Sequence, residues 1–182
     1  MKAYADKAVS SLKQAASDAS TNRWFWPALA FALLIYAVDQ ASKYWILYVF
    51  ELPAKQSVSV LPFFNLSMVW NEGVSFGLLA GANARVLLSV FSGIVALGLI
   101  YWLASLRRPL LAFAVGGVIG GAIGNLTDRI IHGAVVDFFD FSALYFPWVF
   151  NVADSAISVG VVFILLDAIL TPEVKASAKS QD

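Results

Sequence analysis

The chain has 182 residues, of which 60% are hydrophobic and 13% are charged, against roughly half and a quarter in typical soluble domains. A soluble chain of this length could not bury so much apolar surface, so the composition indicates one integral membrane domain. The formal net charge is zero, which excludes the broad basic surface that nucleic-acid binding requires.

Few side chains are available for catalysis. The chain contains no cysteine, and His132 is its only histidine, so disulfides, thiol nucleophiles and typical zinc sites are excluded. A scheme that uses the lone imidazole as a base stays open, but hydrolytic chemistry would fall mainly to carboxylates. We expect no metal and no cofactor.

Residues 1–22 are rich in alanine and serine, and they lack the apolar core of a cleavable signal peptide. We interpret them as a loose polar tail. A weak helix near the membrane surface is the alternative, but its apolar face of Val9, Leu12 and Ala16 is poor. At the other end of the chain, residues 172–182 form a second polar tail.

Four apolar runs lie between these tails, in a domain of residues 23–171, and each reaches the roughly 20 residues that a membrane-spanning helix needs. They cover about residues 24–48, 84–106, 110–131 and 152–170. Glycines in the third run recur every four residues, which lets another helix approach closely; they are Gly116, Gly120 and Gly124, with Gly117 and Gly121 beside them. We interpret this stripe as a packing surface rather than a substrate site.

Positive charges predict the orientation of these helices. With four spans, one side holds Lys2, Lys7, Lys13, Arg23, Arg107, Arg108, Lys175 and Lys179, and the other holds Lys43, Lys55, Arg85 and Arg129. The first side has more of them, so the positive-inside rule predicts that both termini are cytoplasmic.

Two segments then lie on the outer side. Residues 51–82 contain two alternating stretches, 57–61 and 65–70, among prolines and glycines, which predicts a small strand-and-turn element. Residues 132–150 are dense in aromatic side chains, which are favoured at the membrane interface. The expected fold is an all-α four-transmembrane-helix bundle with a small β-rich loop element and an interfacial aromatic segment.

Polar side chains near a membrane segment are costly and therefore indicate a function. Under this topology four clusters fall at one depth near the outer leaflet: Asp39 with Lys43; Asn71; Asn125 with Asp128 and Arg129; and Asp137 with Asn151 and Asp154. This convergence is the main argument from the residues for a site.

Most of these clusters also have a purely structural interpretation. Asp39 and Lys43 are spaced as an ion pair on a helix surface. Asn125, Asp128 and Arg129 could simply stabilise the end of the third helix. Asn151 and Asp154 fit an N-cap and its capping-box partner. From the residues alone these alternatives stay open.

Asp137 has no such explanation. It lies among apolar residues, where a carboxylate needs a partner, a raised pKa or water, whereas Asp140 fits a solvated interfacial residue. Two carboxylates brought together in a poorly solvated place share a proton. The charged one can then activate water while the protonated one binds the scissile carbonyl.

Five sequence blocks resemble the lipoprotein signal peptidases, also called signal peptidase II, of bacterial cytoplasmic membranes. They are Asp39-Gln40-Ala41-Ser42-Lys43, Asn71-Glu72-Gly73-Val74-Ser75-Phe76-Gly77, Gly124-Asn125-Leu126-Thr127-Asp128-Arg129, Val135-Val136-Asp137-Phe138 and Phe150-Asn151-Val152-Ala153-Asp154-Ser155. The resemblance runs from about Trp24 to Leu170. The family often has small alanines where this chain has Val74 and Ser75.

The resemblance implies an aspartic endopeptidase whose catalytic residues are Asp137 and Asp154. It further implies that the site or the substrate is supported by Asp39, Lys43, Asn71, Gly73, Asn125, Asp128, Arg129 and Asn151. The implied substrates are prolipoproteins with a diacylglyceryl-modified cysteine, cut just before that cysteine. The implied location is the bacterial inner membrane, with the site and both outer segments facing the periplasm. We expect a monomer that contacts membrane lipids.

Three other functions remain to be weighed. A small proton- or ion-coupled transporter also places acids in a membrane, but the middle of all four helices is apolar. A structural scaffold explains the glycines and leaves the clustered acids unexplained. A Ser/Lys peptidase would use Ser42 and Lys43, but adjacent residues point about 100° apart on a helix.

Overall fold

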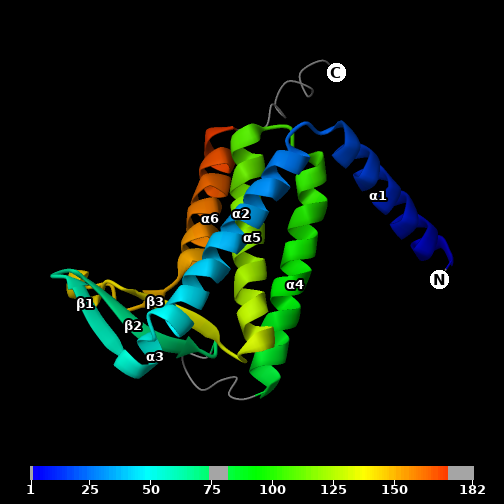
Figure 1. The fold of residues 1–182 in the computed structure, drawn as a ribbon. Helices are drawn as coiled ribbons and strands as arrows, with labels where there is room; N and C mark the ends of the chain where they lie inside the picture. The colour runs from blue at the N-terminus through cyan, green and yellow to red at the C-terminus, as the bar shows by residue number, and fades with distance from the viewer. Residues whose placement is uncertain (1, 74–81, 172–182) are drawn as a thin grey trace.

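The computed structural model describes residues 2–73 and 82–171. Within these residues four helices are long and apolar enough to cross a membrane. They are α2 (Phe25–Tyr44), continued by the π-helix η1 (Trp45–Val49), α4 (Ala82–Ser105), α5 (Pro109–Ile131) and α6 (Val152–Leu170). The four predicted helices are confirmed, and Figure 1 shows them as one bundle with the start of α2 and the end of α6 at the same end.

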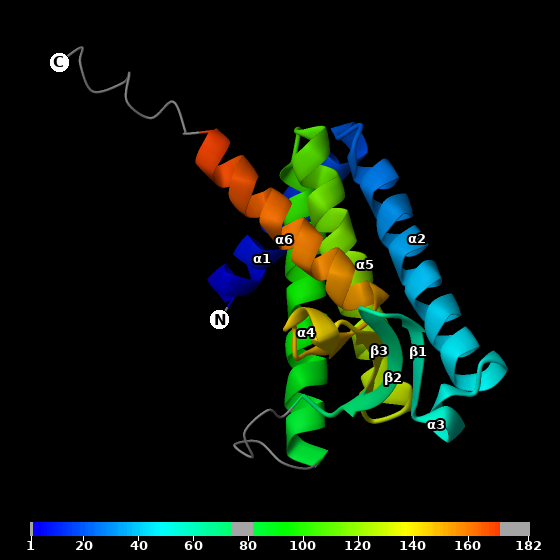
Figure 2. The same ribbon diagram turned by 90° about the vertical axis from the view of Figure 1, so that its left-hand side faces the viewer.

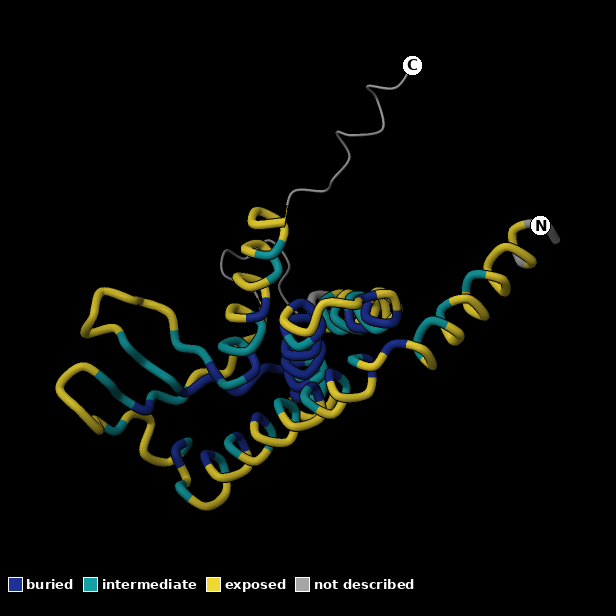
Figure 3. The backbone as a smooth tube through the Cα atoms, turned by 90° about the horizontal axis from the view of Figure 1, so that it is seen from above, coloured by how far each residue is buried: buried dark blue, intermediate teal, exposed yellow. Residues whose placement is uncertain are grey.

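Helix α5 is the central element of the bundle. It packs against α2, α4 and α6, and the view in Figure 3 shows it as a mostly buried helix surrounded by partly exposed ones. The outer helices present large apolar side chains such as Leu33, Leu97 and Leu165. In a bilayer these side chains face lipid, so their exposure carries no penalty there.

The glycines of α5 face two different neighbours. A Cβ on Gly120 would overlap the carbonyl oxygen of Ala32 in α2 and lie 2.9 Å from Ile35 Cβ. On the adjacent face, a Cβ on Gly121 would lie 2.5 Å from the carbonyl oxygen of Ala153 in α6. The prediction that these glycines allow close helix packing is confirmed.

A four-stranded antiparallel sheet in the order β1-β2-β3-β4 lies beside one end of the bundle. Strands β1 (Ser57–Leu61) and β2 (Phe64–Asn71) confirm the prediction for this part of the 51–82 segment, while Val74–Gly81 lie outside the described residues. Strands β3 (Val135–Asp140) and β4 (Val149–Phe150) come from the aromatic segment, for which the sequence analysis predicted no strand.

Alternation along β3 separates its apolar side chains from its acid. Val136 and Phe138 are buried in a cluster with Ile46 of η1 and with Leu52 of the short helix α3 (Leu52–Lys55). Because successive side chains of a strand point to opposite faces, Asp137 points away from this cluster. The hydrophobic cluster thereby fixes which way the acid faces.

The prediction of a loose N-terminal tail is wrong for residues 2–21, which form helix α1 (Lys2–Thr21). This segment contains neither proline nor glycine and is rich in alanine, the strongest helix former. Ala15 and Ala19 pack against the bundle core, and this contact stabilises a helix that the poor apolar face did not predict. The second predicted tail, 172–182, lies outside the described residues.

The close approach of α2 and α5 can be tested with Gly120→Ala. The added methyl group has no room beside Ala32 and Ile35, so we expect the free energy of unfolding to fall by about 1–3 kcal/mol, measured by thermal or denaturant unfolding in detergent micelles. Gly98→Ala is the matched control, since nothing lies within 4 Å of a Cβ there. We expect it to be neutral or to stabilise α4 by up to about 1 kcal/mol, and equal effects of the two changes would contradict the packing.

Candidate active site

Lys43 lies at the centre of a buried polar cluster between the bundle and the sheet. Its side chain is only 3% exposed, and its Nζ lies 2.8 Å from Asp39 Oδ2 and 2.7 Å from Asp128 Oδ2. The ammonium also donates to Asn125 Oδ1 at 3.1 Å. Three acceptors match the three donors of an ammonium group, so this cation links α2 to the end of α5.

The two carboxylates bound by Lys43 also hold backbone from other elements. Asp39 Oδ1 accepts from the amide of Ala153 at 2.9 Å, and Asp128 Oδ2 accepts from the amide of Val136 at 3.0 Å. Ala153 and Val136 directly precede Asp154 and Asp137 in the chain. The predicted i, i+4 ion pair therefore exists, and it also positions the backbone beside each of the two suspected acids.

Gln40 and Gly124 complete this cluster, and the sequence analysis assigned neither of them to the site. Gln40 Nε2 lies 3.1 Å from both Asp39 Oδ2 and Asp128 Oδ1, so its amide bridges the two carboxylates. A Cβ on Gly124 would overlap Asp39 Oδ2, so only glycine lets this acid approach α5. A polar Gln40 next to Asp39 in a membrane segment was the available signal.

Two asparagines connect the two suspected acids. Asn151 Nδ2 donates to Asp137 Oδ1 at 2.7 Å and lies 3.1 Å from Asn125 Oδ1. Asn125 Nδ2 in turn donates to Asp154 Oδ1 at 2.7 Å. The structure thus brings Asp137 and Asp154 into one hydrogen-bonded network although they belong to different elements, β3 and α6.

The predicted capping box of α6 is present. Asp154 N donates to Asn151 Oδ1 at 2.9 Å, and Asn151 N donates to Asp154 Oδ2 at 3.2 Å. Asp154 uses its other oxygen to accept from Asn125. The capping interpretation and the site interpretation are therefore compatible, because one carboxylate satisfies both.

Asp137 is the acid with the most perturbed environment. Its side chain is 1% exposed, and burial together with the charge of Asp154 raises its pKa from 3.8 to about 7, against the opposing effects of hydrogen bonds from Asn71 and Asn151 and the charge of Lys43. A carboxyl group with this pKa exchanges its proton near neutral pH, as acid–base catalysis requires.

Asp140 differs from Asp137 although it lies on the same strand. The Ser67 hydroxyl donates to Asp140 Oδ2 at 2.6 Å and the Ser142 amide donates to Oδ1 at 2.9 Å. These hydrogen bonds hold the pKa of Asp140 below its ordinary value, so this acid stays charged, in agreement with its prediction as a solvated residue.

Strand pairing brings Asn71 to Asp137. Asn71 pairs with Val135 and Val69 pairs with Asp137, so Asn71 and Asp137 lie diagonally on one face of the sheet, and Asn71 Nδ2 donates to Asp137 Oδ2 at 2.9 Å. Gly73, at a φ of +82°, places its amide 2.8 Å from Asn71 Oδ1. This turn holds the Asn71 amide with its NH2 group toward the acid. Val74 and Ser75 of the same sequence block lie outside the described residues.

Arg129 lies beside the acids at the end of α5. Its Nη1 donates to the carbonyl oxygen of Asn125 at 3.3 Å, and the acids around its guanidinium group are Asp154, Asp137 and Asp128. Among the described residues its buried Nε has no hydrogen-bond partner. All the site residues predicted from the sequence are therefore found at this end of the bundle.

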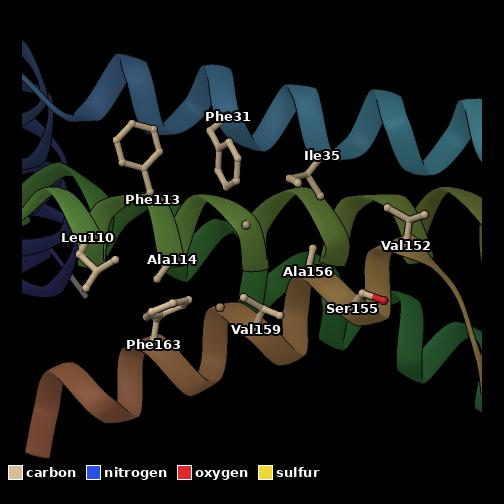
Figure 4. Close-up of a pocket in the computed structure, with 12 residues that line it drawn as sticks. Phe31, Ile35, Leu110, Phe113, Ala114, Val152, Ser155, Ala156, Val159 and Phe163 are labelled. Carbon is tan, nitrogen blue, oxygen red and sulfur yellow. The ribbon is translucent and has the colours of Figure 1, made fainter.

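Two hollows lie near this site. The first has a volume of about 450 Å³ and is lined by Val69, Trp70, Asn71, Glu72, Asp137, Pro147, Trp148 and Val149. The second is an apolar groove of about 370 Å³ between α2 and α6 with α5 as its floor (Figure 4), where Ser155 is the one polar side chain. Figure 2 shows α2 and α6 diverging on either side of α5 away from the sheet. The first hollow therefore adjoins Asp137.

Lys43→Met tests the role of the buried cation. Without the ammonium, Asp39 and Asp128 become uncompensated buried charges, so we expect the free energy of unfolding to fall by about 3–5 kcal/mol. We also expect the loss of the peptidase activity that the sequence resemblance implies. Unfolding and cleavage would be measured on the same purified sample. The exposed Lys55, which donates to Phe50 O at 2.5 Å, provides the control: Lys55→Met should change stability by no more than about 0.5 kcal/mol. A stable, active Lys43→Met protein would contradict the role assigned to Lys43.

Known proteins share both the sequence and the fold. A family profile described as Signal peptidase (SPase) II matches residues 31–170. A lipoprotein signal peptidase of Caulobacter vibrioides is 49% identical over 164 residues, which are 89% of this chain and 98% of that protein. Another from Rhodopseudomonas palustris strain TIE-1 is 43% identical over 153 residues, or 80% and 93% of the two chains.

A solved structure of a bacterial membrane enzyme, determined by the in meso method at 2.3 Å resolution, superposes with a TM-score of 0.72 at 27% identity. The superposition covers 83% of this chain and 92% of that chain. The sequence match, the near-complete coverage of the relatives and the shared fold together show that this chain belongs to the signal peptidase II family of peptidases.

Proposed function

We propose that Asp137 and Asp154 act as one catalytic pair that hydrolyses the signal peptide from prolipoproteins. The peptidase activity follows from the family, and the relatives are named lipoprotein signal peptidases. The observation that supports the pair is the hydrogen-bonded path from Asp137 through Asn151 and Asn125 to Asp154, beside a hollow that Asp137 helps to line.

The proposed reaction needs one proton on the pair. The charged carboxylate takes a proton from a water molecule as that water attacks the scissile carbonyl carbon. The protonated carboxyl group donates a hydrogen bond to the carbonyl oxygen, where negative charge develops. As the carbon–nitrogen bond breaks, a proton passes to the leaving amine and the pair returns to its starting state. Which acid holds the proton is a property of the pair.

The proposed substrate is a prolipoprotein whose cysteine carries diacylglyceryl, with cleavage just before that cysteine. The resemblance of the five sequence blocks supports this choice. A lipid-anchored cysteine keeps its peptide bond near the membrane surface, and the acids lie where the spanning helices end and the sheet begins. The outer segments 51–82 and 138–148 would cradle the peptide there.

We further propose that the peptidase domain is residues 23–171, monomeric, in the bacterial inner membrane with its site facing the periplasm. Supporting this orientation, Arg107 and Arg108 lie in the turn between α4 and α5, at the end of the bundle opposite the sheet (Figure 1). Positively charged turns of this kind favour the cytoplasmic side.

The competing functions have less support. For a transporter, acids and bases should continue along the helices, whereas Asp39, Lys43, Asp128 and Asp154 gather at one end. For a Ser/Lys peptidase, Ser42 should reach a base, but its hydroxyl donates to the carbonyl oxygen of Asp39 at 2.7 Å.

Substitution of each acid tests the pair directly. Asp137→Asn and Asp154→Asn each remove the group that moves a proton while keeping its size, so each should lower kcat by about 10²–10⁴-fold against a diacylglyceryl-modified prolipoprotein. Asp140→Asn is the control on the same strand and should retain activity. Near wild-type cleavage by either single variant would refute the proposal.

The pH profile tests the raised pKa. The pair loses its shared proton as pH rises through about 7, the pKa of Asp137, so kcat/KM should fall above that pH. The free energy of unfolding should also decrease between pH 3.8 and about 7, because the folded state there binds more protons than the unfolded state.

Asn71→Ala should move this alkaline limb to higher pH, because the Asn71 hydrogen bond lowers the pKa of Asp137. Asn65→Ala is the matched control, since Asn65 lies on the same strand opposite Asp140, and its profile should be unchanged. An identical shift in both variants, or a shift to lower pH in Asn71→Ala, would contradict the assignment.

A further inference from the structure

The apolar side chains of α1 share one side of the helix. At 3.6 residues per turn, a continuous arc contains Tyr4, Ala8, Val9, Leu12, Ala15, Ala16 and Ala19. Lys7 lies beyond one edge of this arc and Lys13 beyond the other, while Ser10 and Ser17 lie on the opposite side. An apolar arc flanked by lysines is typical of helices that lie in a membrane interface.

The bundle covers only the C-terminal part of this arc. Ala15 and Ala19 pack against the core, whereas Tyr4, Val9 and Leu12 are 83%, 51% and 64% exposed. Figure 1 shows α1 diverging from α4 toward its N-terminus, which lies beside the middle of the bundle. The exposed part of the arc is therefore available to something other than the bundle.

The junction between α1 and α2 is tied to the bundle by Asn22. Its buried Nδ2 donates to the carbonyl oxygens of Leu103 and Ala104 at 2.9 and 3.2 Å, in the last turn of α4, where helical carbonyls lack their own partners. Its Oδ1 accepts from the amide of Trp24 at 2.9 Å. The end of α1 is thus held at the level where α4 ends and α2 begins.

The end of the bundle where α4 ends and α2 begins carries the residue types that are typical of a membrane–water boundary. Trp24 and Trp26 open the first spanning helix, and tryptophan is favoured in interfaces. Arg23 lies over the Trp24 ring at 4.7 Å, and Arg107 pairs with Asp18 of α1 at 3.8 Å. Because charged side chains are costly inside the hydrocarbon, Lys7 and Lys13 also need to remain at the headgroups, so in a bilayer α1 must lie flatter than its slant in Figure 1.

We propose that α1 binds the surface of an anionic bilayer, with Tyr4, Val9 and Leu12 inserted at the boundary of headgroups and acyl chains. Lys7 and Lys13 at the two edges of the arc meet anionic headgroups, which attract lysines close to a membrane surface. This charge complementarity favours a lipid surface over a second copy of the chain, which would present the same cations. Of the two acids on α1, Asp18 pairs with Arg107 at 3.8 Å, and Asp6 is exposed on the polar side of the helix.

A single fluorescent label on the full-length protein tests the proposal, because the chain contains no native cysteine. Leu12→Cys and Ser10→Cys are labelled with an environment-sensitive dye and reconstituted in nanodiscs of phosphatidylcholine, with or without phosphatidylglycerol. Both positions are exposed in the protein itself, so only a bilayer distinguishes them. We expect a blue-shifted emission and quenching by a lipid-soluble quencher at Leu12→Cys, enhanced by phosphatidylglycerol, and neither at Ser10→Cys.

Charge reversal separates lipid binding from other contacts. Adding Lys7→Glu and Lys13→Glu to the Leu12→Cys protein should abolish the enhancement by phosphatidylglycerol, with peptidase activity unchanged. Equal emission from the two labelled positions would overturn the proposal, and so would a blue shift that is the same with and without phosphatidylglycerol. So would disulfide cross-linking between two Leu12→Cys proteins in place of lipid quenching, since that result identifies a second copy as the partner.

Discussion

One buried ammonium group organises the polar end of this protein. Lys43 Nζ binds the carboxylates of Asp39 and Asp128, and each carboxylate uses an oxygen to hold the backbone amide just before Asp154 or Asp137. An incomplete buried ion cluster is strongly destabilising, because the remaining charge has no partner. The positions of the two acids in β3 and α6 therefore depend on a cation that belongs to α2.

The membrane fold makes this arrangement possible. Lipid covers the outer faces of the helices, so hydrophobic burial gives little preference for one helix pairing over another, and small residues set the close contacts. The same glycine stripe that lets α5 approach α2 and α6 ends at Gly124, where the missing side chain admits Asp39. Packing and site therefore share one sequence pattern, and the hydrophobic cluster beneath β3 then turns Asp137 toward the polar side.

The sequence predicts the features that depend on local pattern. Long apolar runs predicted the four helices, the alternation of apolar and polar residues predicted β1 and β2, and the spacing of Asn151 and Asp154 predicted the capping box. The pairing of β2 with β3 was not predicted, because Asn71 and Asp137 are distant in the chain and only their hydrogen bond shows that they meet. Helix α1 was missed for a similar reason, since contacts of Asn22 and Arg107 with distant residues stabilise it.

The residues alone could not decide between a cap and a catalytic role for Asp154, and the structure explains why: its two oxygens serve different partners, Asn151 N and Asn125 Nδ2. The hydrogen bonds of Asn151 and Asn125 link Asp154 to Asp137.

The most direct measurement is an experimental structure with a substrate analogue in which a secondary hydroxyl replaces the scissile carbonyl. The account predicts that this hydroxyl lies within about 2.5–3.0 Å of a carboxylate oxygen of both Asp137 and Asp154. A hydroxyl that contacts only one of them, or an analogue bound away from both, would contradict it.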